Sequence, residues 1–502
     1  MKKLLLAMFF TVVYFTVNAQ EEKSSVNARP MNIIYILADD HRYDAMGFMN
    51  KIKGLQTPGM DQMAAEGAHL KNAFVSTALC SPSRASILTG QYAHTHTVVD
   101  NSAPLPTNLV FFPQYLQKSG YQTAFMGKWH MGNTADQPQP GFNYWLSFEG
   151  QGVYNNPTFN INGKRVKQPE GSYTTDLLTD YSIEWLQKQN KKKPFFLYLS
   201  HKGVHSEFYP AKRHQGKYAD IPIITPPSMY ITATDSSKYF GTATAPASPV
   251  NFKDIPAWVR NQRYSWHGVD FMYHNTIQFD DFYRQYLETL QAVDESVQRI
   301  MSWVRENGLE DNTMIVYMGD NGFSFGEHGL IDKRHAYEES MRVPLLVWAP
   351  GLVKPKSVIE ETVMNVDLAP AFLQLAGIKK PTQMQGESFA PILEGKKIPW
   401  RNRVFYEYYW ESAFPSTPTI FAVRTDRYKY IYNYGSWDIN ELYDLEKDPY
   451  EMNNLVRDKN YQKEGLKLKQ ELFDWLKTTD GLQIPLKQPG NIRFDNRFDK
   501  TY

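Results

Sequence analysis

Cys80 is the only cysteine in the 502-residue chain, and it opens the stretch Cys80-Ser81-Pro82-Ser83-Arg84. A lone cysteine cannot form an internal disulfide. Taken by itself, an unpaired cysteine is more often a small buried apolar residue than a reactive group. Its chemistry therefore depends on which other polar residues the fold brings to it.

Two pairs of oxygen-bearing residues each follow an apolar run. Asp39 and Asp40 follow residues 32–38, and Asp320 and Asn321 follow residues 313–318. Oxygen ligands of this kind suit Ca²⁺ or Mg²⁺ better than Zn²⁺. Without a cation, like charges about 4 Å apart cost about 4 kcal/mol at an effective dielectric of about 20. The alternative is that the first pair caps a helix and the second forms a turn.

Basic and titratable residues form a third set. Arg84, Lys128 and Lys333 are able to bind an anion such as sulfate, although Lys333 also fits a solvated charge run. His130 and His205 are candidates for a general acid and a general base, since histidine titrates near neutral pH. A single histidine is more often structural, so both interpretations stay open.

The segments before these residues predict how they are positioned. Continuous apolar runs at 32–38, 121–126, 194–200, 313–318 and 344–348 are typical of strands buried on both faces. Helical patterns alternate with them at 83–89, 174–189, 279–307 and 367–375. This alternation predicts an α/β fold with a large mixed, mostly parallel sheet between helices, which places ligands outside the carboxyl ends of its strands.

The chain also divides along its length. Residues 1–19 have the pattern of a signal peptide and 20–30 that of a polar linker. We expect a catalytic domain over 31–398, with an irregular insertion near the site at 206–275. Short alternating segments and a final helical pattern predict a smaller α+β subdomain with an antiparallel sheet over 399–502.

Composition limits the partners. Lys and Arg number 54 and Asp and Glu 53, which argues against a nucleic-acid partner. The 32 tyrosines and 11 tryptophans suit carbohydrate contacts as well as ordinary packing. The signal pattern predicts an exported protein, periplasmic or secreted. No later apolar run is long enough to span a bilayer, so we expect no membrane anchor.

The Cys80 stretch and the Ala-Ser-Ile-Leu-Thr-Gly run after it resemble the signature of the type I, formylglycine-dependent sulfatases. The resemblance extends from about Asn32 to Leu455, and further segments carry it: Ile36-Leu37-Ala38-Asp39-Asp40, Thr57-Pro58-Gly59-Met60-Asp61, Gly127-Lys128-Trp129-His130, the Pro194 to His205 stretch, Gly319-Asp320-Asn321-Gly322, Gly326-Glu327-His328-Gly329 and the run from Glu441 to Pro449. The chain is similar to the glycan sulfatases of bacteria that degrade polysaccharides.

That resemblance implies an alkaline-phosphatase-like fold and a site that contains one Ca²⁺ ion. The implied metal ligands are Asp39, Asp40, Asp320, Asn321 and Cys80, the last converted to formylglycine (3-oxoalanine) by a separate maturation enzyme. The implied residues around the sulfate are Arg84, Lys128, His130, His205 and Lys333. The family often has proline before the histidine at 205, where this chain has Val204, so His201 competes for that role.

The resemblance implies hydrolysis of sulfate esters on a sulfated glycan. Candidate substrates are algal polysaccharides such as ulvan, and glycosaminoglycan or mucin sugars such as N-acetylglucosamine 6-sulfate. The alternatives are a phosphomonoesterase or phosphodiesterase on the same fold, and an inactive glycan-binding protein. His94, His96, His328, Arg342 and Tyr154 are candidates for lining a sugar pocket or for plain structure.

We predict that Cys80→Ser abolishes turnover and traps sulfated enzyme. A serine-derived sulfate ester has no second hydroxyl on its carbon, so it cannot expel sulfate by elimination. Turnover assays and the intact mass of the variant test this expectation. In the wild-type protein, the Cys80 peptide should have the lower mass of formylglycine. Normal multiple turnover by the serine variant would contradict the mechanism.

Overall fold

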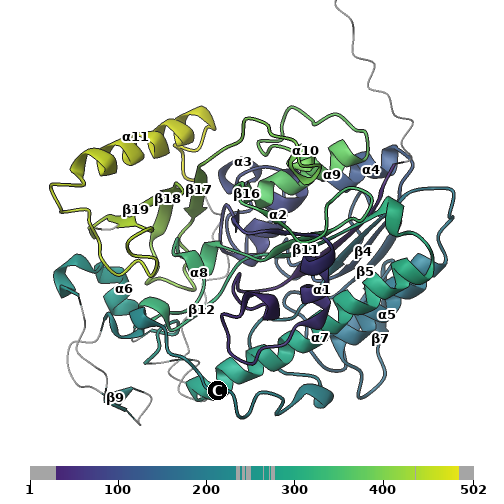
Figure 1. The fold of residues 1–502 in the computed structure, drawn as a ribbon, viewed down its shortest axis with the longest axis horizontal. Coiled ribbons are helices and arrows are strands. Elements are labelled where there is room, and N and C mark those ends of the chain that lie inside the picture. The colour runs from purple at the N-terminus through teal and green to yellow at the C-terminus, as the bar shows by residue number, and fades with distance from the viewer. Residues whose placement is uncertain are drawn as a thin grey trace, which may run out of the picture.

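The computed structural model describes residues 30–485, except 233–237, 240–242, 245–249, 264, 271, 273–276 and 436. Its centre is a ten-stranded mixed sheet flanked by helices, with a smaller sheet at one side (Figure 1). The predicted signal peptide and all of the predicted linker except Pro30 lie outside the described residues. No helix in the described part of the chain has the length and apolar character needed to cross a membrane.

The large sheet has the order β15-β2-β14-β11-β1-β8-β4-β5-β6-β7. Parallel pairings join the central strands β11, β1, β8, β4 and β5. In sheet order, the strands are β15 (Ser357–Ile359), β2 (Ala68–Leu70), β14 (Leu345–Trp348), β11 (Thr313–Gly319), β1 (Asn32–Ala38), β8 (Phe195–Ser200), β4 (Gln122–Gly127), β5 (Tyr144–Ser147), β6 (Thr158–Ile161) and β7 (Lys164–Lys167).

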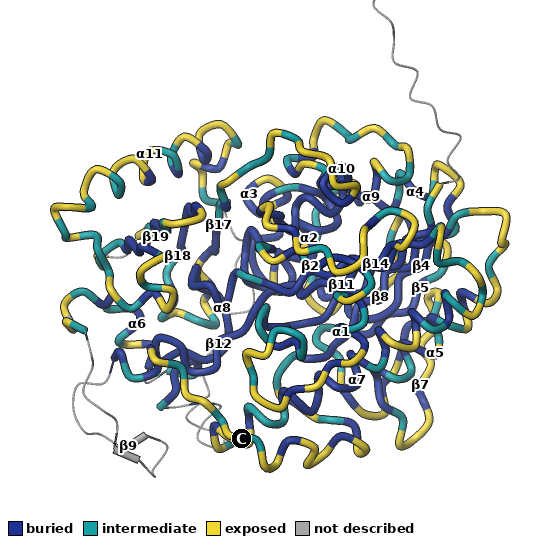
Figure 2. The backbone as a smooth tube through the Cα atoms, viewed as in Figure 1, coloured by how far each residue is buried: buried dark blue, intermediate teal, exposed yellow. Residues whose placement is uncertain are grey.

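Each face of this sheet has its own hydrophobic core. Along β1, Ile33 and Tyr35 join the core beneath α2 (Cys80–Thr89), α4 (Phe112–Lys118) and α9 (Leu368–Leu375). Ile34 and Ile36 join the opposite core beneath α1 (Pro58–Glu66), α5 (Thr174–Gln187) and α7 (Phe279–Glu306). Because successive strand residues face opposite sides, burial on both faces requires a continuous apolar run. Figure 2 shows these central strands as buried.

The smaller sheet is antiparallel and has the order β17-β18-β19-β20, with bounds β17 (Val404–Tyr408), β18 (Thr419–Arg424), β19 (Tyr428–Tyr434) and β20 (Glu441–Asp444). Helix α11 (Gln462–Thr478) contacts β18 and β19 and buries Leu468 and Leu472. In Figure 1 this layer lies beside the large sheet, next to α8 (Glu338–Met341). The predicted fold class, a large mostly parallel sheet between helices with a smaller antiparallel sheet, is confirmed.

The structure differs from the sequence prediction mainly at the borders of the large sheet. β14 pairs antiparallel with β11, and the short strands β2, β15, β5, β6 and β7 were not predicted. All four residues of β7 are exposed, and its sequence Lys-Arg-Val-Lys has no apolar run. The charges of such an edge strand protect it from pairing with another chain. Because of the same charges, a search for apolar runs does not detect the strand.

Segment 206–275, predicted as irregular, contains short ordered elements in its described part. These are η2 (Lys212–His214), η3 (Pro227–Tyr230), β9 (Lys238–Tyr239), β10 (Ala243–Thr244), η4 (Phe252–Asp254) and α6 (Ala257–Gln262). Backbone contacts tie this segment to the loop around residue 330: Val269 donates to Gly329 and Ile331 donates to His267. The segment is therefore held next to the loop that leads to Lys333.

Candidate functional site

Four parallel strands deliver the predicted polar residues to one edge of the sheet. The last residues of these strands are in register, since Ala38 pairs with Gly319, Leu37 with Ser200, and Ser200 with Gly127. The residues that follow the strand ends are therefore neighbours in space. They are Asp39 and Asp40 after β1, Asp320 and Asn321 after β11, Lys128 and His130 after β4, and Lys202 and His205 after β8.

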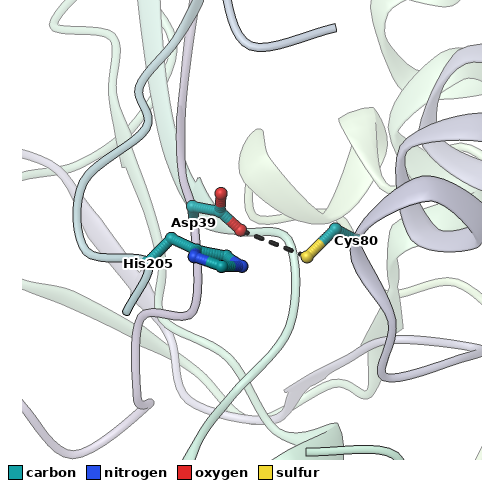
Figure 3. A group of neighbouring side chains, drawn as sticks. All are labelled: Asp39, Cys80 and His205. Atoms are coloured by element: carbon teal, nitrogen blue, oxygen red, sulfur yellow. Dashed lines mark hydrogen bonds between the residues drawn. The ribbon is translucent and has the colours of Figure 1, made fainter. Parts of the chain in front are cut away.

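Cys80 reaches the same place from a different element. It is the first residue of α2, which begins earlier than the predicted 83–89 and ends at Gly90 with φ of 66°. Its Sγ lies 3.4 Å from Asp39 Oδ1, and His205 lies beside the pair (Figure 3). Burial, together with the nearby Asp39, raises the pKa of the Cys80 thiol well above its ordinary value. The unmodified side chain is thus a neutral thiol, which is a poor nucleophile.

Arg84 lies one helical turn after Cys80 and joins three strand ends. Its guanidinium donates to Asp320 Oδ2 at 2.9 Å, and to Lys128 O and Ser200 Oγ at 2.7 Å each. The side chain is fully buried, so these contacts replace its hydration. Arg84 therefore fixes α2 against the sheet edge as well as neutralising a carboxylate. Ser200 had no sequence signal beyond its place at a strand end.

The three carboxylates have positive partners. Lys128 Nζ forms a very short contact with Asp39 Oδ2, and Lys333 Nζ lies 2.6 Å from both oxygens of Asp40. Asn321 Nδ2 donates to Asp40 Oδ1 at 2.7 Å, and the Asp40 backbone N–H donates to Asp320 Oδ1 at 3.0 Å. All ten residues predicted for the site lie together, including Lys333, which directly follows the hairpin of β12 (Ser324–Phe325) and β13 (Ile331–Asp332).

The charges of these carboxylates are unequal. Burial tends to raise the pKa of Asp39, but Lys128, His205 and Arg84 hold it well below its usual value. Burial raises the pKa of Asp40 to about 6, and burial together with Asp39 raises that of Asp320 to about 7. For Asp40 and Asp320, the surrounding positive charge thus does not fully offset the effect of burial on the pKa.

This donor set fits a hard divalent cation. Asp39, Asp40 and Asp320 each offer an oxygen within 4.8 Å of the others, and the buried Asn321 Oδ1 has no hydrogen-bond partner among the described residues. Oxygen-only donors with an orphaned amide oxygen suit Ca²⁺ or Mg²⁺. A second group, Asp39, Cys80 and His205, shares Asp39 with the first.

The two candidate histidines lie at the cleft. His205 Nε2 is 4.0 Å from Asp40 Oδ2, and Tyr154 donates its hydroxyl proton to the His205 carbonyl at 2.6 Å. Burial and Lys128 hold the pKa values of His130 and His205 well below the usual range. His201, the competitor for the role of His205, is instead fully buried against α7, with its Nε2 3.0 Å from Ser296 Oγ.

A cleft of about 1450 Å³ opens above these groups. Its lining includes His130, Lys202, His205 and Lys333. Residues from distant parts of the chain form its walls. These walls contain five aromatic residues and one arginine: Tyr154, Tyr209, Trp266, Trp410, Phe414 and Arg334. Arg334 pairs with Asp332 and with Glu411, and its guanidinium lies 3.7 Å from the Phe414 ring centroid. The smaller sheet's domain thus contributes directly to the cleft.

Of the five residues considered for a sugar pocket, only Tyr154 lines the cleft. His94 pairs with Glu407, and His96 Nε2 contacts Ser86 Oγ. His328 stacks on Tyr337 with ring centroids 3.8 Å apart, and Arg342 contacts Glu338 and the Tyr43 ring. These four side chains are structural. Each of them is near a site motif in the sequence, but none of the four lies on the lining of the cleft.

An anion-binding edge, a pocket for a hard cation and a nucleophile position on a helix together suit a hydrolase of anionic esters. The comparisons make this more specific. The family model described as Sulfatase matches residues 31–378, and one described as N-sulphoglucosamine sulphohydrolase, C-terminal, matches 326–478. The chain belongs to the sulfatase family and is a sulfuric ester hydrolase.

Several relatives have curated names or solved structures. An N-acetylglucosamine-6-O-sulfatase of Bacteroides thetaiotaomicron is 34% identical, over 91% of this chain and 87% of its own. The N-acetylglucosamine-6-sulfatase of Capra hircus is 31% identical, over 86% and 80%. A more distant ulvan-active sulfatase of Formosa agariphila is 27% identical, over 88% and 79%. A structure in complex with its substrate, D-glucosamine-2-N,6-O-disulfate, superposes with TM-score 0.78 at 32% identity, covering 92% of this chain and all of the other.

We predict that Ca²⁺ stabilises the protein more at pH 8 than at pH 5. Without a cation, the raised pKa values of Asp40 and Asp320 mean that between about pH 4 and pH 7 the folded state holds protons that the unfolded state lacks, so stability falls as pH rises across that window. A cation favours the ionised carboxylates and offsets that loss. At a free concentration of about 100 times Kd it adds about 2.7 kcal/mol.

Thermal unfolding with Ca²⁺ and with a chelator at both pH values measures this effect. Asp294→Asn is the matched control, because burial raises the pKa of Asp294 to about 6 while its oxygens accept from Gly59 and Met60 outside the site. The control should keep the Ca²⁺-dependent shift in Tm. Equal shifts at both pH values would contradict the assignment of the cation to these carboxylates.

Proposed function

We propose that this enzyme removes the 6-O-sulfate from N-acetylglucosamine or a related glucosamine unit of a sulfated glycan. The observation that carries the proposal is the similarity, above 30% identity over most of both chains, to sulfatases named for that sugar position. The ulvan-active relative is more distant. The aromatic walls of the cleft support a sugar substrate, because rings pack against sugar faces.

In the proposed mechanism, one Ca²⁺ ion would be held by Asp39, Asp40, Asp320, Asn321 and the modified Cys80. Bound there, the ion supplies a positive charge for a sulfate oxygen and for the nucleophile. Formylglycine at position 80 would supply, as its hydrate, a hydroxyl nucleophile for the sulfate ester. The neutral thiol described above supports this proposal, because Cys80 without modification lacks a reactive thiolate.

The remaining steps belong to side chains. Lys128 and Lys333, which pair with Asp39 and Asp40 in the structure, would bind sulfate oxygens if those carboxylates were engaged by a cation. His205 donates a proton to the departing sugar oxygen after the negative charge of the bound sulfate ester has raised its lowered pKa, and the Tyr154 hydroxyl holds the His205 backbone in place. His130 accepts the proton whose removal releases sulfate from residue 80. Arg84 keeps residue 80 aligned with Asp320.

The enzyme is expected to act outside the cytoplasm, in the periplasm or as a secreted protein, after a maturation enzyme has oxidised Cys80. The signal-peptide pattern of residues 1–19 supports export. The conversion of Cys80 is expected before folding, since Cys80 is fully buried in the structure.

A panel of substrates tests the proposed function. We expect the Ca²⁺-loaded, formylglycine-bearing enzyme to desulfate N-acetylglucosamine 6-sulfate and to leave the 3-sulfate, N-acetylgalactosamine 6-sulfate and ulvan oligosaccharides largely unchanged. Phosphomonoesters and phosphodiesters are included in the panel to test the alternative phosphatase or phosphodiesterase activity. Activity on ulvan oligosaccharides alone, or on a phosphodiester without any sugar sulfate, would overturn the assignment.

We also predict that His205→Ala lowers kcat about 10²- to 10⁴-fold for a sugar sulfate, the usual contribution of a general acid. The loss should be much smaller for a nitrophenyl sulfate, because its leaving group departs without a proton. His201→Ala is the control, since His201 contacts Ser296 and not the cleft. Equal losses on both substrates in the His205 variant would argue against proton donation by His205.

A further inference from the structure

Lys202 differs from the other lysines at the floor of the cleft. Lys128 pairs with Asp39 and Lys333 pairs with Asp40. Among the described residues, no carboxylate lies within ion-pair distance of the Lys202 ammonium and no acceptor receives a hydrogen bond from it. The side chain is only 5% exposed, yet it lies on the lining of the cleft. The Lys202 stem is buried and its ammonium reaches the cleft with no described counter-charge, which indicates that a negatively charged partner arrives with a ligand.

The surroundings of Lys202 hold it in position without neutralising it. Its Nζ lies 4.7 Å from the centroid of the buried Tyr154 ring, and a ring face stabilises a cation but carries no net charge. Neighbouring backbone is tied to β1, since His201 donates to Leu37 O at 2.8 Å and Val204 donates to Asp39 O at 2.7 Å. Lys202 is therefore held at the end of β8 and is not a mobile side chain at the entrance of the cleft.

The charges that act on Lys202 show which end of the cleft it faces. Burial and the positive charge of Lys128 lower its pKa to about 8, while Asp39, Asp40 and Cys80 act in the opposite direction. These residues are the nucleophile position and the cation ligands. Lys202 thus lies at the reacting end of the cleft. Lys128, Lys202 and Lys333 approach it from three different segments, which matches the three free oxygens of a sulfate ester.

Resting on the proposed function, we propose that Lys202 is a further substrate-binding residue that donates a hydrogen bond to an oxygen of the scissile sulfate. It complements Lys128 and Lys333 and is the one lysine of the three that needs no release from a carboxylate before it binds. The same ammonium then holds the sulfate product until that product leaves.

Inorganic sulfate is the probe, because its binding needs no turnover and no sugar. We expect Lys202→Met in the Ca²⁺-loaded, mature enzyme to weaken sulfate binding, measured by calorimetry and by product inhibition, at least about tenfold, as for the loss of one charge-assisted hydrogen bond. Lys202→Arg should restore binding to within about threefold. Lys217→Met is the matched control, because Lys217 also lies over a tyrosine ring, 5.6 Å from the Tyr218 centroid, but outside the cleft lining.

Two substrates separate the alternatives. If Lys202 binds the sulfate, its methionine variant loses kcat/KM by a similar factor on a sugar sulfate and on a nitrophenyl sulfate. Unchanged sulfate affinity with a loss on the sugar sulfate alone would overturn the proposal in favour of a sugar contact. Unchanged sulfate affinity and unchanged activity would make Lys202 a structural residue and overturn it as well.

A measurement on the wild-type protein keeps the proposal falsifiable if the methionine variant does not fold. Amine-reactive reagent should label Lys202 in the sulfate-free enzyme, and saturating inorganic sulfate should protect it several-fold, read by peptide mass spectrometry, while Lys217 is labelled equally in both. No protection would overturn the proposal. If sulfate protects Lys202 but no sugar sulfate is hydrolysed, the proposed function fails and the assignment of Lys202 to sulfate stands.

Discussion

The central constraint on this structure is the burial of three carboxylates at the ends of two adjacent strands. Asp39, Asp40 and Asp320 are fully buried and close together, so each needs compensating positive charge. Arg84 and Lys128 compensate one side of the cluster and Lys333 the other. Their compensation is incomplete for Asp40 and Asp320, whose pKa values are raised. The remaining negative charge is what a divalent cation would compensate, in keeping with the proposed Ca²⁺ site.

This arrangement separates the residues proposed for the reaction from the segments that form the walls of the cleft. The reacting groups lie on the rigid edge of the central sheet and on α2, where register and packing fix them. The walls of the cleft come from segments that lie far apart in the sequence, including Trp266 in the 206–275 segment and Trp410 beyond β17. Such walls can change without disturbing the sheet edge. The reaction is therefore a property of the core, and the choice of sugar is a property of the surrounding loops.

The sequence predicted the central sheet well because these strands are buried on both faces. The runs at 32–38 and 313–318 correspond to β1 and β11 within one residue. The long helix predicted at 279–307 is α7. The prediction missed strands whose burial is one-sided or absent, as in the charged edge strand β7. It left open which strands of the mixed sheet are antiparallel, as β14 is. Strand direction depends on which neighbours a strand meets, which no local pattern contains.

The sequence by itself determined which polar residues gather around residue 80, because the residue types and their positions at strand ends are local features. Asp39, Lys128, His205 and Asp320 all follow apolar runs, and parallel strands bring such positions to one edge. Only the tertiary structure decided which other polar residues face the cleft. It buried His328 against Tyr337, put His201 against α7, and left Lys202 on the cleft lining with no carboxylate of the described residues in ion-pair distance. Those outcomes depend on contacts between segments hundreds of residues apart, where burial and charge balance outweigh neighbourhood in sequence.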